Sequence, residues 1–205
     1  MRIGEQFARV STRIGTRPAA DASEPVERLV AENRRLVAEI GRLSARVTEL
    51  EAHADTDPLV DVYNRRAFMR EIDRAQAVSA RYHIPSAVVF LDLNRFKAVN
   101  DRHGHAVGDE LLRLIGEGLS ASVRHCDLVA RLGGDEFGVL LFKTTPEEAR
   151  AKAEALVCRI QSCRVELPGE TVAVDAASGV SACEPGISPE AVLSRADREM
   201  YRGKG

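Results

Sequence analysis

Residues 128–142, LVARLGGDEFGVLLF, contain two apolar runs separated by a Gly-Gly pair and two acids. Apolar runs on both sides of a flexible pair predict a β-hairpin, with strands at about 128–132 and 137–142. A hairpin bend needs flexible residues but has no need of two adjacent carboxylates. Asp135 and Glu136 are therefore candidates for a functional site.

The segments around this hairpin alternate between helix and strand patterns. Outward from the hairpin, the sequence predicts a helix at about 105–123, a buried strand at Ser86–Asp92, a helix from Pro146 to about 164 and a strand at 171–183. The order is β-α-β-β-α-β, the split βαβ arrangement of a ferredoxin-like α+β fold with an antiparallel central sheet. Further helices are expected from Asn64 to about Tyr82 and from Pro189 to about Tyr201.

This topology brings a third acid to the hairpin. The first strand and the strand that follows the helix run parallel, so the end of the first strand lies at the same edge as the hairpin turn. Asp92 should therefore lie close to Asp135 and Glu136. Converging carboxylates form an all-oxygen site for Mg²⁺, which completes its coordination with water and phosphate oxygens. The sequence thus predicts a metal site for a substrate that carries a polyphosphate.

A heptad pattern precedes the globular region. Leucine recurs every seven residues at Leu29, Leu36, Leu43 and Leu50, and a second series includes Asn33 and Ile40. Leucine at d, β-branched residues at a and one polar a position favour a parallel two-stranded coiled coil; the alternative is an amphipathic helix lying on its own domain. We divide the chain into a frayed segment at 1–23, a coiled-coil helix at 24–55 and a globular domain at 56–205.

Composition excludes several classes of function. The chain has 29 basic and 31 acidic residues and a formal charge of -2, so it has no field suited to duplex nucleic acid. Its four cysteines lack zinc spacing. No apolar run is long enough for a membrane span, and residues 1–23 lack the apolar stretch of a secretory signal. A cytoplasmic protein is the expectation, although a partner-binding or membrane-surface helix near the N-terminus is the alternative for residues 1–23.

Four blocks resemble the GGDEF-type diguanylate cyclases in order and spacing. They are DPLVDVYNRRAF from Asp57, LDLNRFKAVNDRHGHAVGDELL from Leu91, RLGGDEFGVLL from Arg131 and ADREMYRGK from Ala196. The resemblance covers the chain from about residue 55 onward. It implies a palm-type GGDEF fold and the condensation of two GTP molecules into cyclic di-GMP, with release of two pyrophosphates.

The resemblance also implies a role for each site residue. Asp92, the Leu93 carbonyl, Asp135 and Glu136 would hold two Mg²⁺ or Mn²⁺ ions, and Asp135 would help to deprotonate the attacking 3′-hydroxyl. Asn100 and Asp109 would recognise guanine, since a carboxylate accepts from both N1–H and the exocyclic amine. Lys97 and Lys204 would neutralise phosphate charge, and His105, Gly133 and Gly134 would line the nucleotide site.

One domain binds one GTP, so the resemblance implies a homodimer in which two domains face each other. A parallel coiled coil would raise their effective concentration. Arg124 and Asp127 form an R-x-x-D at the spacing of the family's inhibitory product site, where arginine binds phosphate or guanine and aspartate binds a guanine edge. The alternative is a surface ion pair, because Arg70 and Asp73 satisfy the same bare motif.

Three positions depart from the family pattern. Val60 and Asp61 stand where Thr and Gly are usual, Asn94 stands where Asp is common, and the sequence stops at Gly205, before a basic residue and final strand that commonly follow. Three other functions remain as alternatives: a degenerate domain that is a receptor for GTP or cyclic di-GMP, a cyclase or polymerase-like palm that acts on one nucleotide or a primer, and a coiled-coil scaffold.

Overall fold

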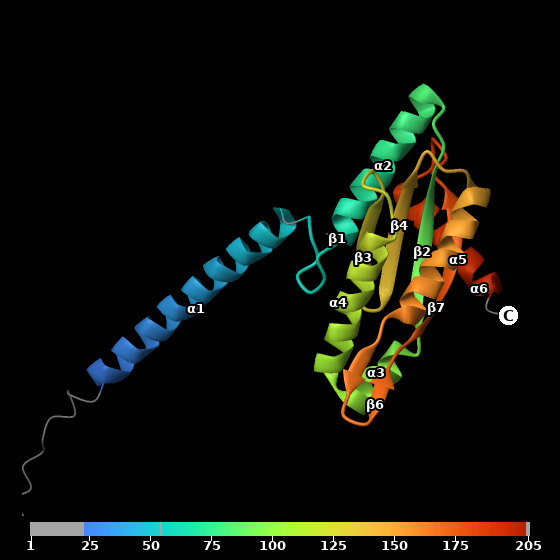
Figure 1. The fold of residues 1–205 in the computed structure, drawn as a ribbon. Coiled ribbons are helices and arrows are strands. Elements are labelled where there is room, and N and C mark those ends of the chain that lie inside the picture. The colour runs from blue at the N-terminus through green and yellow to red at the C-terminus, as the bar shows by residue number, and fades with distance from the viewer. Residues whose placement is uncertain (1–22, 54, 204–205) are drawn as a thin grey trace, which may run out of the picture. The chain divides into compact units, whose positions relative to one another are not determined.

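The computed structural model describes residues 23–53 and 55–203, which form two units divided after His53 (Figure 1). The first unit is a single helix, α1 (Ser23–His53), as the heptad pattern predicts. Its apolar stripe is exposed, with Leu36 at 53% and Leu43 at 55% of their full accessibility. Residues 1–22 of the predicted frayed segment lie outside the described residues, and Ser23 already begins α1.

The second unit is an α+β domain built on a five-stranded sheet of order β1-β3-β4-β2-β7. Its strands and helices, in chain order, are β1 (Tyr63–Asn64), α2 (Arg65–Tyr82), β2 (Ser86–Asn94), α3 (Phe96–His103), α4 (His105–Ala121), β3 (Leu128–Gly133), β4 (Glu136–Phe142), α5 (Pro146–Ser162), β5 (Val165–Leu167), β6 (Glu170–Val172), β7 (Asp175–Ala182) and α6 (Pro189–Gly203). Strand β2 lies between β4 and β7 and is antiparallel to both. The predicted ferredoxin-like order is confirmed.

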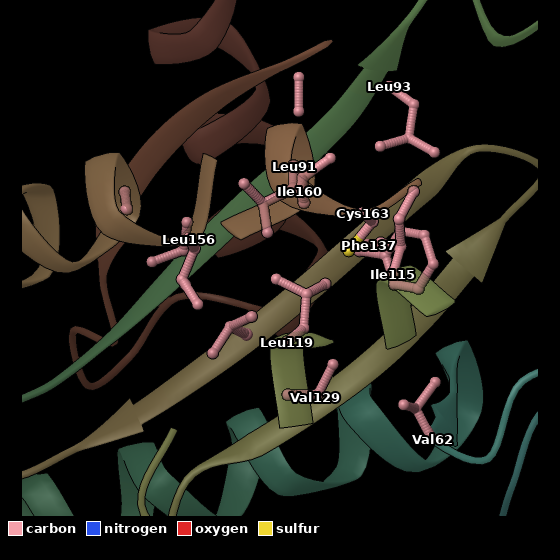
Figure 2. Packing of buried hydrophobic residues seen from close by; sticks show 14 of the residues in the cluster. Val62, Leu91, Leu93, Ile115, Leu119, Val129, Phe137, Leu156, Ile160 and Cys163 are labelled. Carbon is pink, nitrogen blue, oxygen red and sulfur yellow. The ribbon is translucent and has the colours of Figure 1, made fainter. Parts of the chain in front are cut away.

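Helices cover both faces of the sheet. Alternate side chains of β2, Val89 and Leu91 among them, pack with residues of α4 and α5 such as Ile115 and Leu156 (Figure 2). The other side chains of β2, Val88 and Phe90, pack with α2 and α6. Because β2 is buried on both faces, its sequence is a continuous apolar run rather than an alternating one.

Local sequence fixes the ends of the helices. Asn64 is the N-cap of α2, and its side chain accepts a hydrogen bond from the Ala67 amide at 3.0 Å. Thr145 and Glu148 form a reciprocal capping box at the start of α5. The Ser188 hydroxyl accepts from the Ala191 amide at the start of α6, at 3.2 Å. These ends agree with the starts that the sequence predicts.

Two parts of the domain differ from the sequence prediction. The strand expected over 171–183 is wrong as a single element, since β6 ends at Val172 and pairs with β5 in a separate hairpin, and β7 begins at Asp175. A left-handed turn at Gly169 folds β6 back onto β5, which takes it out of the main sheet. Helix α3 was not predicted, because eight residues are too short to establish a helical period.

Candidate active site

The Gly-Gly pair forms the bend between β3 and β4. Gly133 and Gly134 have φ angles of 148° and 52°, in the region that favours glycine. A Cβ built on either residue would meet no heavy atom within 4 Å, so the surface beside the bend is open. The two glycines therefore serve the bend's conformation and leave its backbone accessible to a ligand.

Arg131 holds this bend in place, a role that the sequence alone does not indicate. Its Nε and Nη2 donate to the Gly134 carbonyl at 3.0 and 2.8 Å, and its Nη1 donates to Oδ1 of Asp57 at 3.2 Å. The same Asp57 oxygen accepts from the amides of Leu59 and Val60. The turn that precedes α2 is thereby tied to the hairpin turn. Two blocks, 74 residues apart, each contain one member of this ion pair, and only the fold reveals the pairing.

Asp92 lies where the topology predicts. It pairs in register with Glu136 across β2 and β4. One residue further on, the Leu93 amide donates to the Asp135 carbonyl at 3.2 Å. The amide and the carbonyl of one residue in an extended strand point to the same side, so the Leu93 carbonyl faces the hairpin as well. The chain thus brings Asp92, Leu93, Asp135 and Glu136 together at one end of the sheet.

The acids at this end of the sheet repel one another, and the repulsion adds to the effect of burial on the pKa of Glu136. Burial raises the pKa of Glu136, and the neighbouring charges of Asp92 and Asp135 raise it further, while Arg65 lowers it. Glu136 lines a hollow of about 220 Å³ whose other walls include Arg65 from α2 and Asp197 from α6. A cation at this edge would relieve the repulsion.

The donor set fits a magnesium ion that keeps several waters. Within residues 23–53 and 55–203 no three His, Cys, Asp or Glu side chains are grouped so that they could hold a metal ion by themselves. Mg²⁺ is usually held by one or two carboxylates together with waters and substrate phosphates, rather than by a cage made of protein alone. Asp92, Asp135 and the Leu93 carbonyl match that requirement, and Glu136 lies beside them as a further oxygen donor.

The residues expected to contact the nucleotide lie on α3 and α4. Lys97 is exposed near the start of α3, and Asn100 is half-buried on the same helix. Gly104 joins the two helices, and its amide donates to the Asn100 carbonyl at 2.9 Å. His105 is exposed at the first position of α4, and Asp109 is half-buried one turn later. The unpredicted α3 is therefore the element that positions Asn100 and Lys97.

Two further expectations meet different outcomes. Lys204 lies outside the described residues. The Asn94 side chain forms a hydrogen bond with Asp175 on the neighbouring strand β7. The pKa of Asp175 is lowered, chiefly by a hydrogen bond from the Gln161 side chain and further by hydrogen bonds from the Ala176 amide and from Asn94. An aspartate at position 94 would face the Asp175 carboxylate, so an asparagine there relieves a repulsion.

The R-x-x-D residues lie in the loop before β3. The Asp127 carboxylate accepts from two backbone amides, that of Arg124 at 3.0 Å and that of Phe142 at 3.1 Å. It thus fixes the loop, and its contact with Arg124 is through the main chain. Arg124 is exposed and lines a hollow of about 350 Å³ together with Asp127, Lys143 and Lys152. Three basic and two acidic residues, Asp127 and Glu148, line this hollow.

A protein-family model described as the diguanylate cyclase GGDEF domain matches residues 54–205. The chain belongs to this family. Diguanylate cyclase DgcP of Pseudomonas aeruginosa is 36% identical over 149 residues, which are 73% of this chain and 22% of DgcP. The probable diguanylate cyclase DgcT of Escherichia coli is 34% identical over 154 residues, 74% of this chain and 34% of DgcT. The chain therefore spans about a third or less of these two relatives.

Solved structures of this GGDEF family have the same fold. The coiled coil and GGDEF domain of DgcB from Caulobacter crescentus, in complex with c-di-GMP, superposes with a TM-score of 0.68 and 27% identity, covering 86% of this chain and 94% of that one. Diguanylate cyclase SiaD of Pseudomonas aeruginosa, in complex with its activator SiaC, gives a TM-score of 0.70 and 26% identity, covering 89% and 74%. No helix among the described residues is long and apolar enough to cross a membrane.

Proposed function

We propose that this GGDEF protein is a diguanylate cyclase that joins two GTP molecules into cyclic di-GMP. The observation that carries the proposal is the convergence of Asp92, Leu93, Asp135 and Glu136 at the open glycine turn. Crowded oxygen donors beside an accessible backbone suit a triphosphate and its metal. The family membership of residues 54–205 supports the same reaction.

The reaction is an in-line displacement carried out twice. The 3′-oxygen of one GTP forms a bond to the α-phosphorus of the other, the bond from that phosphorus to the bridging oxygen breaks, and pyrophosphate leaves. Asp135 accepts the proton of the 3′-hydroxyl. Two Mg²⁺ or Mn²⁺ ions per site, held by Asp92, Asp135, Glu136 and the Leu93 carbonyl, would supply charge neutralisation at the phosphate oxygens.

The remaining residues bind and orient GTP. Asp109 accepts from N1–H and the exocyclic amine of guanine, a pair of donors that adenine lacks, and Asn100 contributes a second polar contact from α3. Lys97, exposed at the start of α3, neutralises phosphate charge, as does Lys204. His105 lies at the joint of the two helices, and Gly133 and Gly134 leave room for phosphate or ribose.

The active form is a parallel homodimer through α1. Each domain supplies one GTP, so two domains must face each other for the 3′-hydroxyl of one nucleotide to reach the phosphate of the other. The exposure of Leu36 and Leu43 in a single chain supports a second copy of α1 as the surface that buries them. The DgcB structure also combines a coiled coil with a GGDEF domain.

Product inhibition is the second part of the proposal. Cyclic di-GMP carries two phosphates, and the hollow at Arg124 gathers Arg124, Lys143 and Lys152 as cations. Asp127 holds the loop through its two backbone contacts. The Arg124 side chain then binds the product directly. Asp127 contributes to product binding mainly because it fixes the backbone of Arg124.

A receptor without catalysis is the competing function. The cyclic di-GMP phosphodiesterase NbdA of Pseudomonas aeruginosa is 34% identical over 188 residues, 91% of this chain and 24% of NbdA, so similarity alone does not establish synthesis of cyclic di-GMP. The complete set of Asp92, Lys97, Asp135 and Glu136 favours catalysis.

Incubation of the purified protein with GTP and Mg²⁺, followed by mass analysis of the product, tests the proposal. Cyclic di-GMP with two pyrophosphates is expected, and Asp135→Asn should lower the rate by about 10³-fold, because it removes a metal ligand and the base. GTP binding without product would support the receptor, and a linear or 3′,5′-monocyclic product would support the palm-type alternatives.

A further inference from the structure

Helix α4 contains a buried glycine, Gly108, next to the guanine-recognition residue Asp109. A Cβ built on Gly108 would overlap Oδ1 of Asn100, lie 3.0 Å from its Cγ, and lie 3.2 Å from Cζ of Phe96. The amide of Asn100 therefore occupies the space in which any other residue at position 108 would have its side chain. Because Gly108 has no side chain, the Asn100 amide from α3 can lie directly against the backbone of α4.

The overlap between a Cβ at position 108 and the Asn100 amide can be relieved more easily than an overlap with a rigid core side chain. Asn100 is half-buried, and its side-chain amide can rotate about the χ1 and χ2 torsions. A Cβ at position 108 is therefore accommodated when the amide rotates away. Phe96 is almost fully buried, but its ring lies at a distance that a shift of a few tenths of an ångström relieves. The fold survives this adjustment, whereas the direction of the Asn100 amide does not.

We propose that Gly108 is a positioning residue for guanine binding, because it fixes the Asn100 amide in the orientation that contacts the GTP base. The proposal rests on the proposed function, in which Asn100 and Asp109 recognise guanine. Gly108 itself touches no substrate and acts only through Asn100. Any side chain at position 108 weakens GTP binding by about as much as removal of the Asn100 amide does.

Gly116 provides a matched control on the same helix. It is also buried, two turns further along, and a Cβ there would overlap Cγ1 of Val60. Val60 is 1% exposed and lies in the main core, where its β-branched side chain has few alternative rotamers. Gly116→Ala should therefore destabilise the domain without acting on Asn100.

The experiment is a double-mutant cycle on the full chain. The wild type, Gly108→Ala, Asn100→Ala and the double variant are titrated by calorimetry with a GTP analogue whose α–β bridging oxygen is a methylene group, so that no turnover occurs. Gly108→Ala and Asn100→Ala should each weaken binding about ten-fold, the order of one lost hydrogen bond, and the double variant no further than Asn100→Ala alone. In turnover assays KM for GTP should rise while kcat at saturating GTP stays unchanged.

Several outcomes would overturn the inference: wild-type affinity in Gly108→Ala, multiplied losses in the double variant, or a melting temperature of Gly108→Ala as low as that of Gly116→Ala. A Gly108→Ala chain that fails to fold would also contradict it, because rotation of Asn100 would then not accommodate the Cβ. These results leave the proposed function standing as long as the wild type binds the analogue. A wild type that does not bind it overturns both.

Discussion

The leucines of α1 and those of the globular domain differ in exposure. In α1, Leu36 and Leu43 keep more than half of their accessible surface, while Leu111 and Leu156 in the globular domain are fully buried. Burial of one such side chain stabilises a structure by about 1.5–3 kcal/mol. The domain gains this stabilisation within one chain, because its leucines are buried in its own core. The exposed leucines of α1 gain it when they pack against another surface.

This difference separates two tasks. A domain that has its own core on both faces of a sheet can fold by itself, and in the proposed function it binds one GTP. A helix with an exposed apolar stripe is suited to join two such domains. We expect changes in α1 to affect turnover and leave binding intact, and changes in the domain to affect binding or regulation.

Among the changes that distinguish α1 from the globular domain, the largest effect is expected when the apolar stripe of α1 is broken. Replacement of Leu36 and Leu43 by aspartate should leave GTP binding unchanged and lower turnover about 100-fold at micromolar protein, because the two domains lose their effective concentration. Turnover should then rise steeply with protein concentration. Steady-state rates and sedimentation measure both changes.

Ala38→Asp is the matched control for this experiment, since position 38 lies on the opposite side of the heptad from the leucines. It adds a charge to α1 without touching the apolar stripe and should stay dimeric and active. Full activity of the Leu36/Leu43 variant at high dilution would show that α1 is not needed to bring the domains together.

A smaller effect is expected at the proposed product site of the domain. Arg124→Ala should weaken inhibition by cyclic di-GMP about ten-fold, because hydrogen bonds to a charged group are lost, and leave the initial rate unchanged. The control is Arg70→Ala: Arg70 also begins an R-x-x-D, but it lies on α2 and pairs with Asp55 at 2.8 Å. Equal inhibition constants for the wild type and Arg124→Ala would refute the product site.

The smallest effect concerns the acids at the sheet edge. The pKa of Glu136 is raised in the folded state, so the folded state takes up a proton before the unfolded state as pH falls. Without metal, stability should therefore increase as pH falls from 7 through the folded pKa of Glu136 and level off near its ordinary value. Solvent screening keeps the change small, about 1–2 °C in melting temperature.

Glu136→Gln should remove this component of the pH dependence, which thermal melts in the presence of EDTA would detect. An identical pH profile in Glu136→Gln and the wild type would mean that the crowding of acids does not affect stability.

Much of this architecture follows from local signals. The continuous apolar run of β2, the caps at Asn64 and Thr145, and the glycine turn at Gly134 each depend on residues close in sequence, so a pattern is enough to predict them. The placement of Asp92 beside the hairpin also followed from topology, because parallel strands separated by a helix end at the same edge. Helix α3 and the β5–β6 hairpin are too short for periodicity to identify.

The sequence by itself determined the family, the fold order and the acids at the turn, since each is encoded in a contiguous block. Only the tertiary structure decided which distant residues meet. It paired Arg131 with Asp57, placed the Asn94 side chain on Asp175, gave both oxygens of Asp127 to backbone amides, and set the Asn100 amide against Gly108. Such contacts depend on how α3, α4 and the strand ends pack. The spacing of residues along the sequence does not give the distances between elements that pack together.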